Sequence, residues 1–252
     1  MKGREKRAMS LTIALKAIDG LVLAADSRTT EGYTLRGPKT RDNTIKFIQL
    51  KDDIGVLTYG LSEIGHEGLT LLEEDVSNNR HASLPSIIDK GMETFIKVSS
   101  DWSKMNPEIK RRDKDVGFIL AGYDRGEKEF TIFNLQSPEF LPERVKGGCL
   151  IAGQWHIAKF FINRLYTRGI SVGPALDLAV FLLNTTMTVE KTVGGLIRLA
   201  TITKSKGVQW VSKDEVDFII EKNKRIWIFF RELFYSTLLE VCTHTNKNIS
   251  NR

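Results

Sequence analysis

Short apolar runs separated by polar turns make up the first sixty residues of the chain. The runs LTIALKAI (11–18) and LVLAADS (21–27) are rich in β-favouring side chains and are joined by Asp19-Gly20. An Asp-Gly pair between two such runs is a strong signal for a β-hairpin. The runs TIKFIQL (44–50) and IGVLTYG (54–60), separated by KDD, repeat the pattern. The pattern therefore predicts four strands in two hairpins.

The rest of the chain alternates between helical periodicity and strand-like runs. Two helices are predicted first, over 62–78 and 83–105, with Ser83 as the N-cap of the second helix and Pro85 in its first turn. The later elements follow in order: strands at 115–124, 129–135 and 149–153, helices at 154–169 and 171–191, a hairpin at 196–204 and 207–212, a helix at 213–241 and a polar tail at 242–252. We expect the helix at 154–169 to end at Gly169.

The order of these elements indicates the fold class. Helices come in pairs between groups of strands, which argues against a doubly wound parallel sheet. The strands are apolar on both faces, as in antiparallel sheets that stack on each other and are covered by helices outside. We expect an α+β fold in which two stacked antiparallel sheets are flanked by helices. It forms one domain over residues 10–241, behind an N-terminal extension, 1–9.

Composition and charge narrow the classes of function. The 252 residues are 41% hydrophobic, which suffices for one sizeable core. The net charge of +6 permits an anionic partner, but the Lys and Arg residues are scattered, so we expect neither a nucleic acid nor a membrane partner. Cys149 and Cys242 lie far apart without ligand spacing, which predicts no metal site and no cofactor. No signal peptide or membrane span is apparent, so a cytoplasmic protein is expected.

One stretch of the sequence resembles a known family. TIALKAIDGLVLAADSRTT, followed by the KFIQL strand, the glycine at 60 and the Gly194-Gly195 pair, is similar to β-type proteasome subunits and their HslV-like relatives. These are N-terminal nucleophile (Ntn) hydrolases. The likeness follows the order of elements up to residue 210 and is strongest in the first sixty residues. It implies a four-layer αββα sandwich, a threonine-type protease activity, a peptide or protein substrate, a homo-oligomeric ring and an ATPase partner.

The resemblance also implies roles for individual residues. The nucleophile position falls on Ser10, which would become the N-terminal residue after removal of residues 1–9. The other implied catalytic residues are the buried acid Asp26, its basic neighbour Arg28, the lysine Lys46, the oxyanion-hole glycine Gly60, and Glu190 at a position where the family usually has Asp. The predicted substrate-binding residues are Thr29, Thr58, Tyr59 and Ser62.

The residue types suit this chemistry. A serine hydroxyl is a weak nucleophile at neutral pH and needs an adjacent base. The α-amino group of an N-terminal Ser10 is such a base, because it titrates near pH 8. The positive charge of Lys46, paired with Asp26, would keep the amine and hydroxyl acidic enough to react. Gly60 would let a backbone N–H approach a developing oxyanion.

Departures from the family pattern keep other hypotheses open. Tyr59 replaces a small residue, and Gln154 and Val193 replace serines that support the terminal amine. Each residue also has a purely structural explanation. Asp26 and Lys46 could form a structural ion pair. Gly60 could be needed for the turn from strand to helix, and Glu190 could lie at the end of a helix. The sequence therefore leaves two alternatives to a hydrolase acting through Ser10. One is an inactive structural or assembly subunit of a proteasome-like ring, and the other is a small-molecule Ntn amidohydrolase. The apolar helix over 224–241 is compatible with an interface between proteins. We favour the alternative, in which this helix covers the sheet.

Overall fold

Two five-stranded antiparallel sheets form the centre of the protein. A computed structural model describes residues 10–34, 37–79, 82–109 and 115–249, so the predicted extension 1–9 lies outside the described residues. One sheet has the order β10 (Cys149–Gly153), β1 (Leu11–Lys16), β2 (Gly20–Ala25), β11 (Arg198–Thr203) and β12 (Gly207–Trp210). The other has the order β5 (Phe47–Lys51), β6 (Ile54–Gly60), β7 (Val116–Asp124), β8 (Glu129–Gln136) and β9 (Pro142–Arg144).

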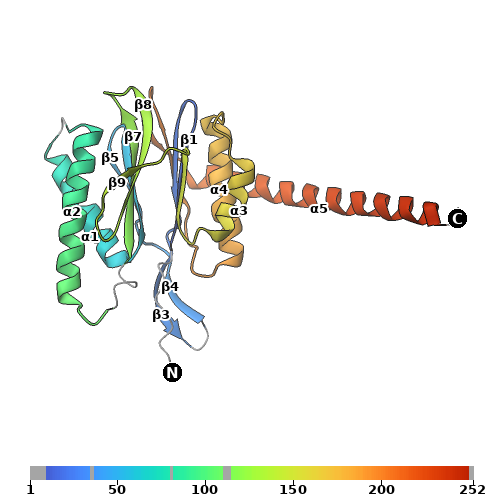
Figure 1. The fold of residues 1–252 in the computed structure, drawn as a ribbon, viewed down its shortest axis with the longest axis horizontal. Helices are drawn as coiled ribbons and strands as arrows, with labels where there is room; N and C mark the ends of the chain where they lie inside the picture. The colour runs from blue at the N-terminus through green and yellow to red at the C-terminus, as the bar shows by residue number, and fades with distance from the viewer. Residues whose placement is uncertain (1–9, 35–36, 80–81, 110–114, 250–252) are drawn as a thin grey trace.

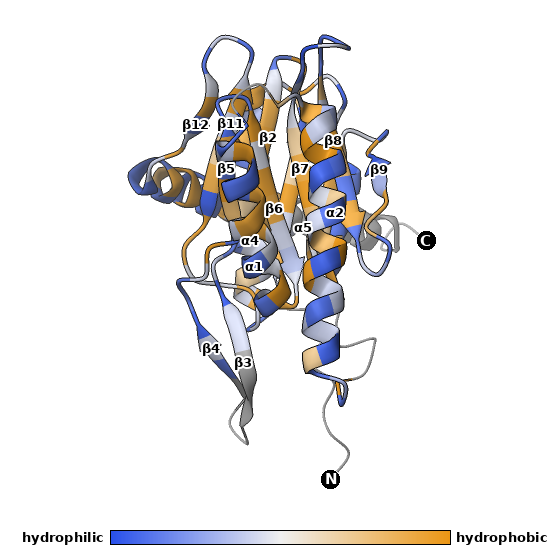
Figure 2. Cartoon of the chain, turned by 90° about the vertical axis from the view of Figure 1, so that its left-hand side faces the viewer, coloured by the Kyte–Doolittle hydropathy of each residue, from blue (hydrophilic) through white to orange (hydrophobic). Residues whose placement is uncertain are grey.

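Helices cover the outer face of each sheet, which gives four layers (Figure 1). The helices α1 (Ser62–Ser77) and α2 (Leu84–Met105) lie on the β7 side, whereas α3 (His156–Leu165) and α4 (Val172–Val189) lie on the β1 side. Buried apolar side chains fill all three spaces between the layers, including the one between the sheets. Figure 2 shows the central strands of the two five-stranded sheets, such as β2, β7 and β8, as strongly hydrophobic. The predicted α+β fold with an αββα order is confirmed.

The predicted hairpins form as expected from their turns. Asp19-Gly20 joins β1 to β2, and Leu15 pairs with Val22 across the hairpin. The strands are buried on both faces because one face meets the second sheet and the other meets helices. Ser83 caps α2, since its hydroxyl accepts a hydrogen bond from the Ser86 amide at 3.4 Å.

Several elements differ from the sequence prediction. A two-stranded hairpin, β3 (Thr29–Thr34) and β4 (Gly37–Arg41), lies between the two predicted hairpins, and β9 was also not predicted. The helix α3 ends at Leu165 instead of Gly169. Its C-cap residue Tyr166 turns back to the sheet and donates hydrogen bonds to the carbonyls of Lys16 (2.8 Å) and Gly148 (3.0 Å). These contacts require Tyr166 to leave the helix.

The helix α4 corrects a further expectation. Among the described helices it is long and apolar enough, by length and composition, to pass as a membrane span, although none was expected from the sequence. Half of it is buried inside the protein. Residues such as Ala179 and Leu183 pack in the core cluster against β1 and β2, so the apolar surface is needed to cover a sheet.

The last helix, α5 (Lys213–Ile249), has two parts. Its first turns pack on the domain, where Val216 and Ile219 are buried in the core cluster and the Trp227 ring contacts Phe161 and Phe181. Beyond this contact the helix projects away from the four layers (Figure 1). It also continues past the predicted end at residue 241. The first part of α5 therefore packs on the helices α3 and α4, and the expectation that residues 224–241 cover the sheet is wrong.

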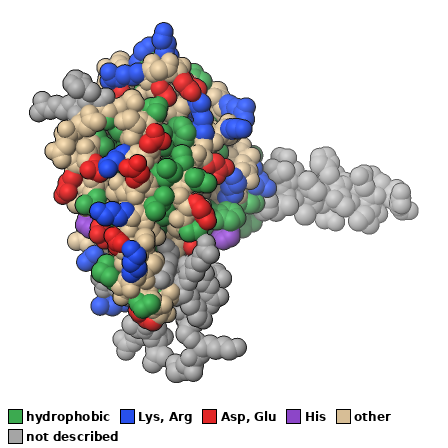
Figure 3. Space-filling view, turned by 60° about the vertical axis from the view of Figure 1, so that its left-hand side comes forward, with side chains coloured by type: hydrophobic (Ala, Val, Ile, Leu, Met, Phe, Trp, Pro, Cys, Tyr) green, Lys and Arg blue, Asp and Glu red, His purple; other side chains and the backbone are tan. Residues whose placement is uncertain are grey.

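The surface carries charges of both signs. Figure 3 shows Lys and Arg side chains interspersed with Asp and Glu over one face of the domain. Many of the exposed charges are paired, as in the Lys90–Asp75 and Arg125–Asp53 contacts. The net positive charge is thus spread out on this face, as the sequence indicated.

Candidate active site

The carboxylate of Asp26 is the centre of a buried polar cluster just after β2. Its side chain is completely buried. One oxygen accepts hydrogen bonds from the Leu11 amide at 2.9 Å and from the Lys46 ammonium at 2.7 Å. The other accepts from the amides of Gly194 at 3.1 Å and Arg28 at 3.2 Å. Four donors thus satisfy the hydrogen-bonding capacity of this buried carboxylate.

Lys46 reaches this carboxylate from the segment before β5. Its side chain is only 4% exposed, and its ammonium donates a second hydrogen bond to the Arg28 carbonyl. Burial lowers the pKa of Lys46, and the charge of Asp26 opposes that effect. The pair joins the end of β2 to the start of β5, and so connects the two sheets.

Ser10 lies directly before β1 and is buried. Its carbonyl accepts a hydrogen bond from the Gln154 amide at 2.7 Å. The chain at Gly153 has a positive φ of 89°, and a Cβ there would lie 1.8 Å from the Ser10 carbonyl oxygen. A glycine is therefore required at 153 for β10 to approach Ser10 this closely.

Arg28 lies beside the cluster, but its guanidinium points elsewhere. Only its backbone amide contacts Asp26, while Nε and Nη2 each bind a carboxylate oxygen of Asp42 at 2.6 Å. Nη1 donates to the Lys191 carbonyl at 3.0 Å. These hydrogen bonds raise the pKa of Arg28 and lower that of Asp42. Arg28 therefore connects the two loops that contain Asp42 and Lys191, beside the cluster.

Close contacts explain why glycines occur at both positions of the Gly194-Gly195 pair. Its amide binds Asp26, and a Cβ at this position would lie 2.5 Å from Cζ of Arg28. The next residue, Gly195, has a positive φ of 75° and would bring a Cβ within 2.5 Å of the Ser27 hydroxyl. The two glycines thus let the chain pass between Asp26 and the Arg28–Asp42 pair.

Gly60 and Glu190 make local contacts of their own. Gly60 ends β6 with a φ of 95°, and a Cβ there would lie 2.3 Å from the Asp115 carbonyl oxygen. The Glu190 carboxylate accepts hydrogen bonds from the Thr192 amide at 3.0 Å and hydroxyl at 2.6 Å. Glu190 therefore stabilises the turn after α4. The catalytic roles of both residues stay predictions.

Three of the predicted substrate-binding residues each have a hydrogen-bond partner of their own. The Thr29 hydroxyl donates to that of Thr44 at 2.6 Å, and the buried Thr58 hydroxyl donates to the Gly117 carbonyl at 3.2 Å. Ser62, at the start of α1, donates to Glu63 at 3.0 Å. Binding of substrate by these residues remains a prediction.

The Tyr59 ring lies over Gly117 of β7. A Cβ at Gly117 would lie 2.2 Å from the ring, and the phenol donates to the Asn134 side chain of β8 at 2.9 Å. Burial raises the pKa of Tyr59 to about 12. The Tyr59 side chain, which is bulkier than the family pattern, therefore lies across the second sheet and is fixed there by its hydrogen bond to Asn134.

The two positions at which the family has supporting serines, 154 and 193, offer no side-chain hydroxyl here. Val193 is completely buried and belongs to the apolar cluster under α4. At position 154, the backbone amide donates to the Ser10 carbonyl. Any support for an amine at Ser10 must therefore come from other groups than two serine hydroxyls.

Sequence reasoning missed two residues of this region. Asp42 is the partner of the Arg28 guanidinium. The Ser27 hydroxyl donates to the Asp42 carbonyl at 2.8 Å and accepts from the Leu196 amide at 2.7 Å. Ser27 lies inside the Asp26–Arg28 segment and Asp42 follows Arg41, and nothing in the pattern around either residue specifies a partner. Within the described residues, no group of His, Cys, Asp and Glu is arranged to hold a metal ion.

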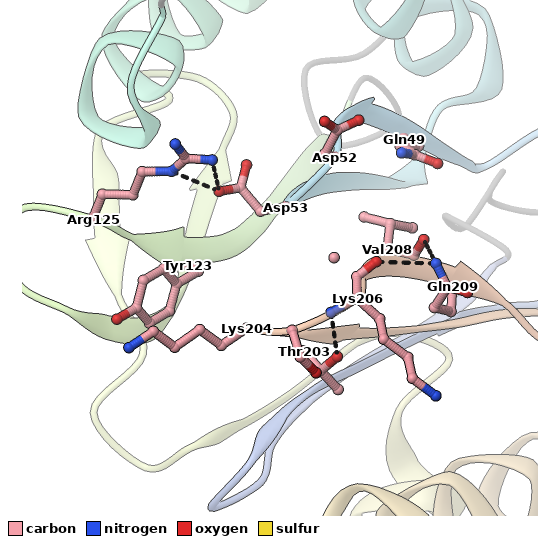
Figure 4. Close-up of a pocket in the computed structure, with 12 residues that line it drawn as sticks. Gln49, Asp52, Asp53, Tyr123, Arg125, Thr203, Lys204, Lys206, Val208 and Gln209 are labelled. Atoms are coloured by element: carbon pink, nitrogen blue, oxygen red, sulfur yellow. Dashed lines mark hydrogen bonds and ion pairs between the residues drawn. The ribbon is translucent and has the colours of Figure 1, made fainter.

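A cavity of about 670 Å³ lies elsewhere (Figure 4). It is formed by the turns that join β5 to β6, β7 to β8 and β11 to β12, and includes Asp53, Tyr123, Arg125, Lys204 and Lys206. The register of β2 on β11 pairs Gly20 with Thr203 and Ala25 with Arg198. Since Thr203 lines the cavity and Asp26 follows Ala25, the cavity is at the opposite end of the sheet from the Asp26 cluster.

Comparison with known proteins gives matches in structure only. No protein-family model matches the sequence, and no curated protein matches it either. Among solved structures, the chain is similar to Anbu, described as an ancestral β-subunit, from Yersinia bercovieri. The TM-score is 0.73 and the identity 16%, over 89% of this chain and 97% of that one. It is also similar to the helical assembly of the Anbu complex from Pseudomonas aeruginosa, with a TM-score of 0.74 and 18% identity, over 89% of this chain and 95% of that one.

A third match, to Anbu from Hyphomicrobium sp. strain MC1, has a TM-score of 0.69 and 17% identity, over 89% of this chain and 97% of that one. These matches correct the family predicted from the sequence. The assignment to the β-type proteasome and HslV-like Ntn hydrolases is wrong, since the matched structures named here are Anbu proteins. Identities this low establish a shared fold, so function must be argued separately.

Proposed function

We propose that this chain is a subunit of a proteasome-like homo-oligomeric assembly, in which it has a structural role. The observation that carries the proposal is the match of about nine tenths of the chain to Anbu proteins, one of them solved as a helical assembly. The surface supports it, because α5 exposes large apolar side chains next to each other, such as Phe229 (67% exposed) and Phe230 (57%). Exposed apolar surface of this kind is typical of protein interfaces.

The test is the mass of the purified full-length chain in solution. Analytical ultracentrifugation over a hundredfold range of concentration should show species at multiples of the 28.5 kDa chain. Electron microscopy of the largest species should then show a ring or a helix. A chain that sediments as a monomer at every concentration would overturn the proposal.

A second candidate function is hydrolysis of an amide bond through Ser10. The buried Asp26–Lys46 pair favours it, because Asp26 also binds the amide of Leu11, the residue next to Ser10. A lysine ammonium that shares a carboxylate oxygen with the amide following a serine is suited to activating that serine as a nucleophile. This function needs a free α-amino group at Ser10, and therefore a chain that begins there. Peptides and small acyl amides are both plausible substrates, and a partner ATPase is a further part of this candidate.

Chains with two different first residues test the second function. One is produced with Ser10 as its N-terminal residue and the other keeps residues 1–9, and both are assayed on fluorogenic peptides and small acyl amides. Hydrolysis by the first chain alone, abolished by Ser10→Ala, would establish the activity. Absence of turnover in both chains would leave the assembly role as the function. Intact-mass measurement on the native protein shows which N-terminus exists.

A further inference from the structure

The projecting part of α5 carries a continuous apolar stripe. Ile226, Phe229, Phe230 and Leu233 are spaced i, i+3, i+4, i+7, so their side chains share one side of the helix. Their exposed fractions are 51%, 67%, 57% and 52%. Four large apolar side chains on one helix side, each more than half exposed, form the pattern by which helices dock on partners.

The stripe begins where the helix leaves its own domain. The Phe230 ring contacts Trp227, whose ring packs on Phe161 and Phe181 of the domain. The stripe therefore continues a set of packed rings outward into solvent. Figure 1 shows this part of α5 standing clear of the four layers, which leaves room for another chain beside it.

The charges beside the stripe fit a second copy of the same helix. Arg225 and Glu232 are seven residues apart, so they lie along the same flank of the stripe. Neither forms an ion pair with any part of the chain that the structure describes. In two antiparallel helices, residues equally far from the crossing point on either side face each other. A crossing point near residue 229 sets Arg225 of each copy against Glu232 of the other.

The same crossing point also matches the apolar residues. The position halfway between Ile226 and Leu233 nearly coincides with the position halfway between Arg225 and Glu232. The two differ by about one residue, or 1.5 Å along the helix axis. One register thus places Ile226 opposite Leu233, puts Phe229 and Phe230 at the centre, and pairs the flanking charges twice. This self-complementarity is what an isologous two-fold contact requires.

We propose that α5 pairs antiparallel with α5 of a second copy of this chain through the stripe of Ile226, Phe229, Phe230 and Leu233. The inference rests on the proposed assembly function and specifies one of its contacts. Phe229 and Phe230 are its anchors, and the two Arg225–Glu232 pairs set its direction.

Matched variants of neighbouring residues test the pairing. Phe229→Glu should raise the dissociation constant of self-association about 30-fold or more in sedimentation equilibrium, because it places a charge at the centre of the contact. Ile228→Glu is the control, since Ile228 is 48% exposed but lies outside the stripe. It should leave the dissociation constant unchanged. Circular dichroism and thermal melting check that both variants fold.

A charge exchange tests the antiparallel direction. Arg225→Glu and Glu232→Arg should each weaken association about tenfold, because each sets like charges against each other. The double variant should restore it to near the wild-type value. A double variant no better than either single one, or equal effects of Phe229→Glu and Ile228→Glu, would overturn the pairing.

The two proposals fail in different ways. If the wild-type chain oligomerises and Phe229→Glu does so equally well, the pairing is wrong and the assembly role stands. If the wild-type chain is monomeric, the assembly role itself fails. Wild-type chain that stays monomeric but co-sediments with phosphatidylglycerol vesicles, and loses this with Phe229→Glu, would assign the stripe to a lipid surface.

Discussion

Replacing Asp26 by Asn should be among the most damaging single changes to stability. The substitution keeps the size of the side chain but removes the charge that pairs with the Lys46 ammonium, which is itself 4% exposed. It also presents an NH2 group to N–H donors such as those of Leu11 and Gly194. Leaving one member of a buried ion pair unpaired costs about 3–5 kcal/mol. A stability of about 5–15 kcal/mol is typical of a whole domain, so the loss is a large fraction.

The assay is urea unfolding followed by circular dichroism, at one protein concentration so that association does not contribute. Asp42→Asn is the control, because Asp42 pairs with Arg28 while 45% exposed. An ion pair at this exposure is worth about 1 kcal/mol or less. If Asp26→Asn destabilised the protein no more than Asp42→Asn does, the buried cluster would not stabilise the fold as described.

The pH dependence of the Asp26→Asn variant provides an independent check. Burial already lowers the pKa of Lys46, and Asp26 is the main group that opposes this effect. Without it the folded-state pKa falls further below the value of the unfolded chain, near 10.4. Between these two pKa values the unfolded chain binds more protons, so stability increases with pH. The deficit of the variant relative to wild type should therefore shrink between pH 7 and pH 10.

Two further predictions concern residues of β6. The pKa of Tyr59 is about 12 in the folded protein, above the ordinary 10.0, so the unfolded chain ionises first and stability should fall between pH 10 and 12. Tyr59→Phe should remove most of that fall, of the order of 1.4 kcal/mol per pH unit, and cost about 1 kcal/mol at pH 8, measured by urea unfolding. Gly60→Ala should cost about 2 kcal/mol or more, because its φ is 95° and the Asp115 carbonyl oxygen is 2.3 Å from the added Cβ. Gly147→Ala, with no atom within 4 Å, is the control in thermal melting. Equal melting temperatures for the two alanine variants, or a pH profile unchanged in Tyr59→Phe, would contradict this reasoning.

The parts of the fold that the sequence predicted are those with strong local signals. The β1–β2 hairpin has an Asp-Gly turn between two apolar runs, and α2 has Ser83 and Pro85 at its start. By contrast, the β3–β4 hairpin is built from TTEGYT and GPKTR, which have no apolar alternation to mark a strand. Its formation depends on the chain around it, and local pattern carries no information about that.

The candidate site shows the same limit at the level of side chains. Asp26 and Lys46 were expected together, and the structure joins them at 2.7 Å. The partner of the Arg28 guanidinium was not foreseen, because Asp42 reaches it only through the path of the chain after β4. A position in a motif predicts which residues are near each other. It does not predict which of two nearby carboxylates an arginine binds.

The peptide group between Ser10 and Leu11 links the two proposed functions. Its carbonyl accepts from the Gln154 amide at 2.7 Å and its N–H donates to Asp26 at 2.9 Å, so both sides of this peptide are held. The two contacts use the carbonyl oxygen of Ser10 and the amide nitrogen of Leu11. Neither uses the α-nitrogen of Ser10. The cluster therefore aligns β1 whether or not residues precede Ser10. It serves an assembly subunit as a structural anchor, and only a free amine at Ser10 would add a catalytic base to it.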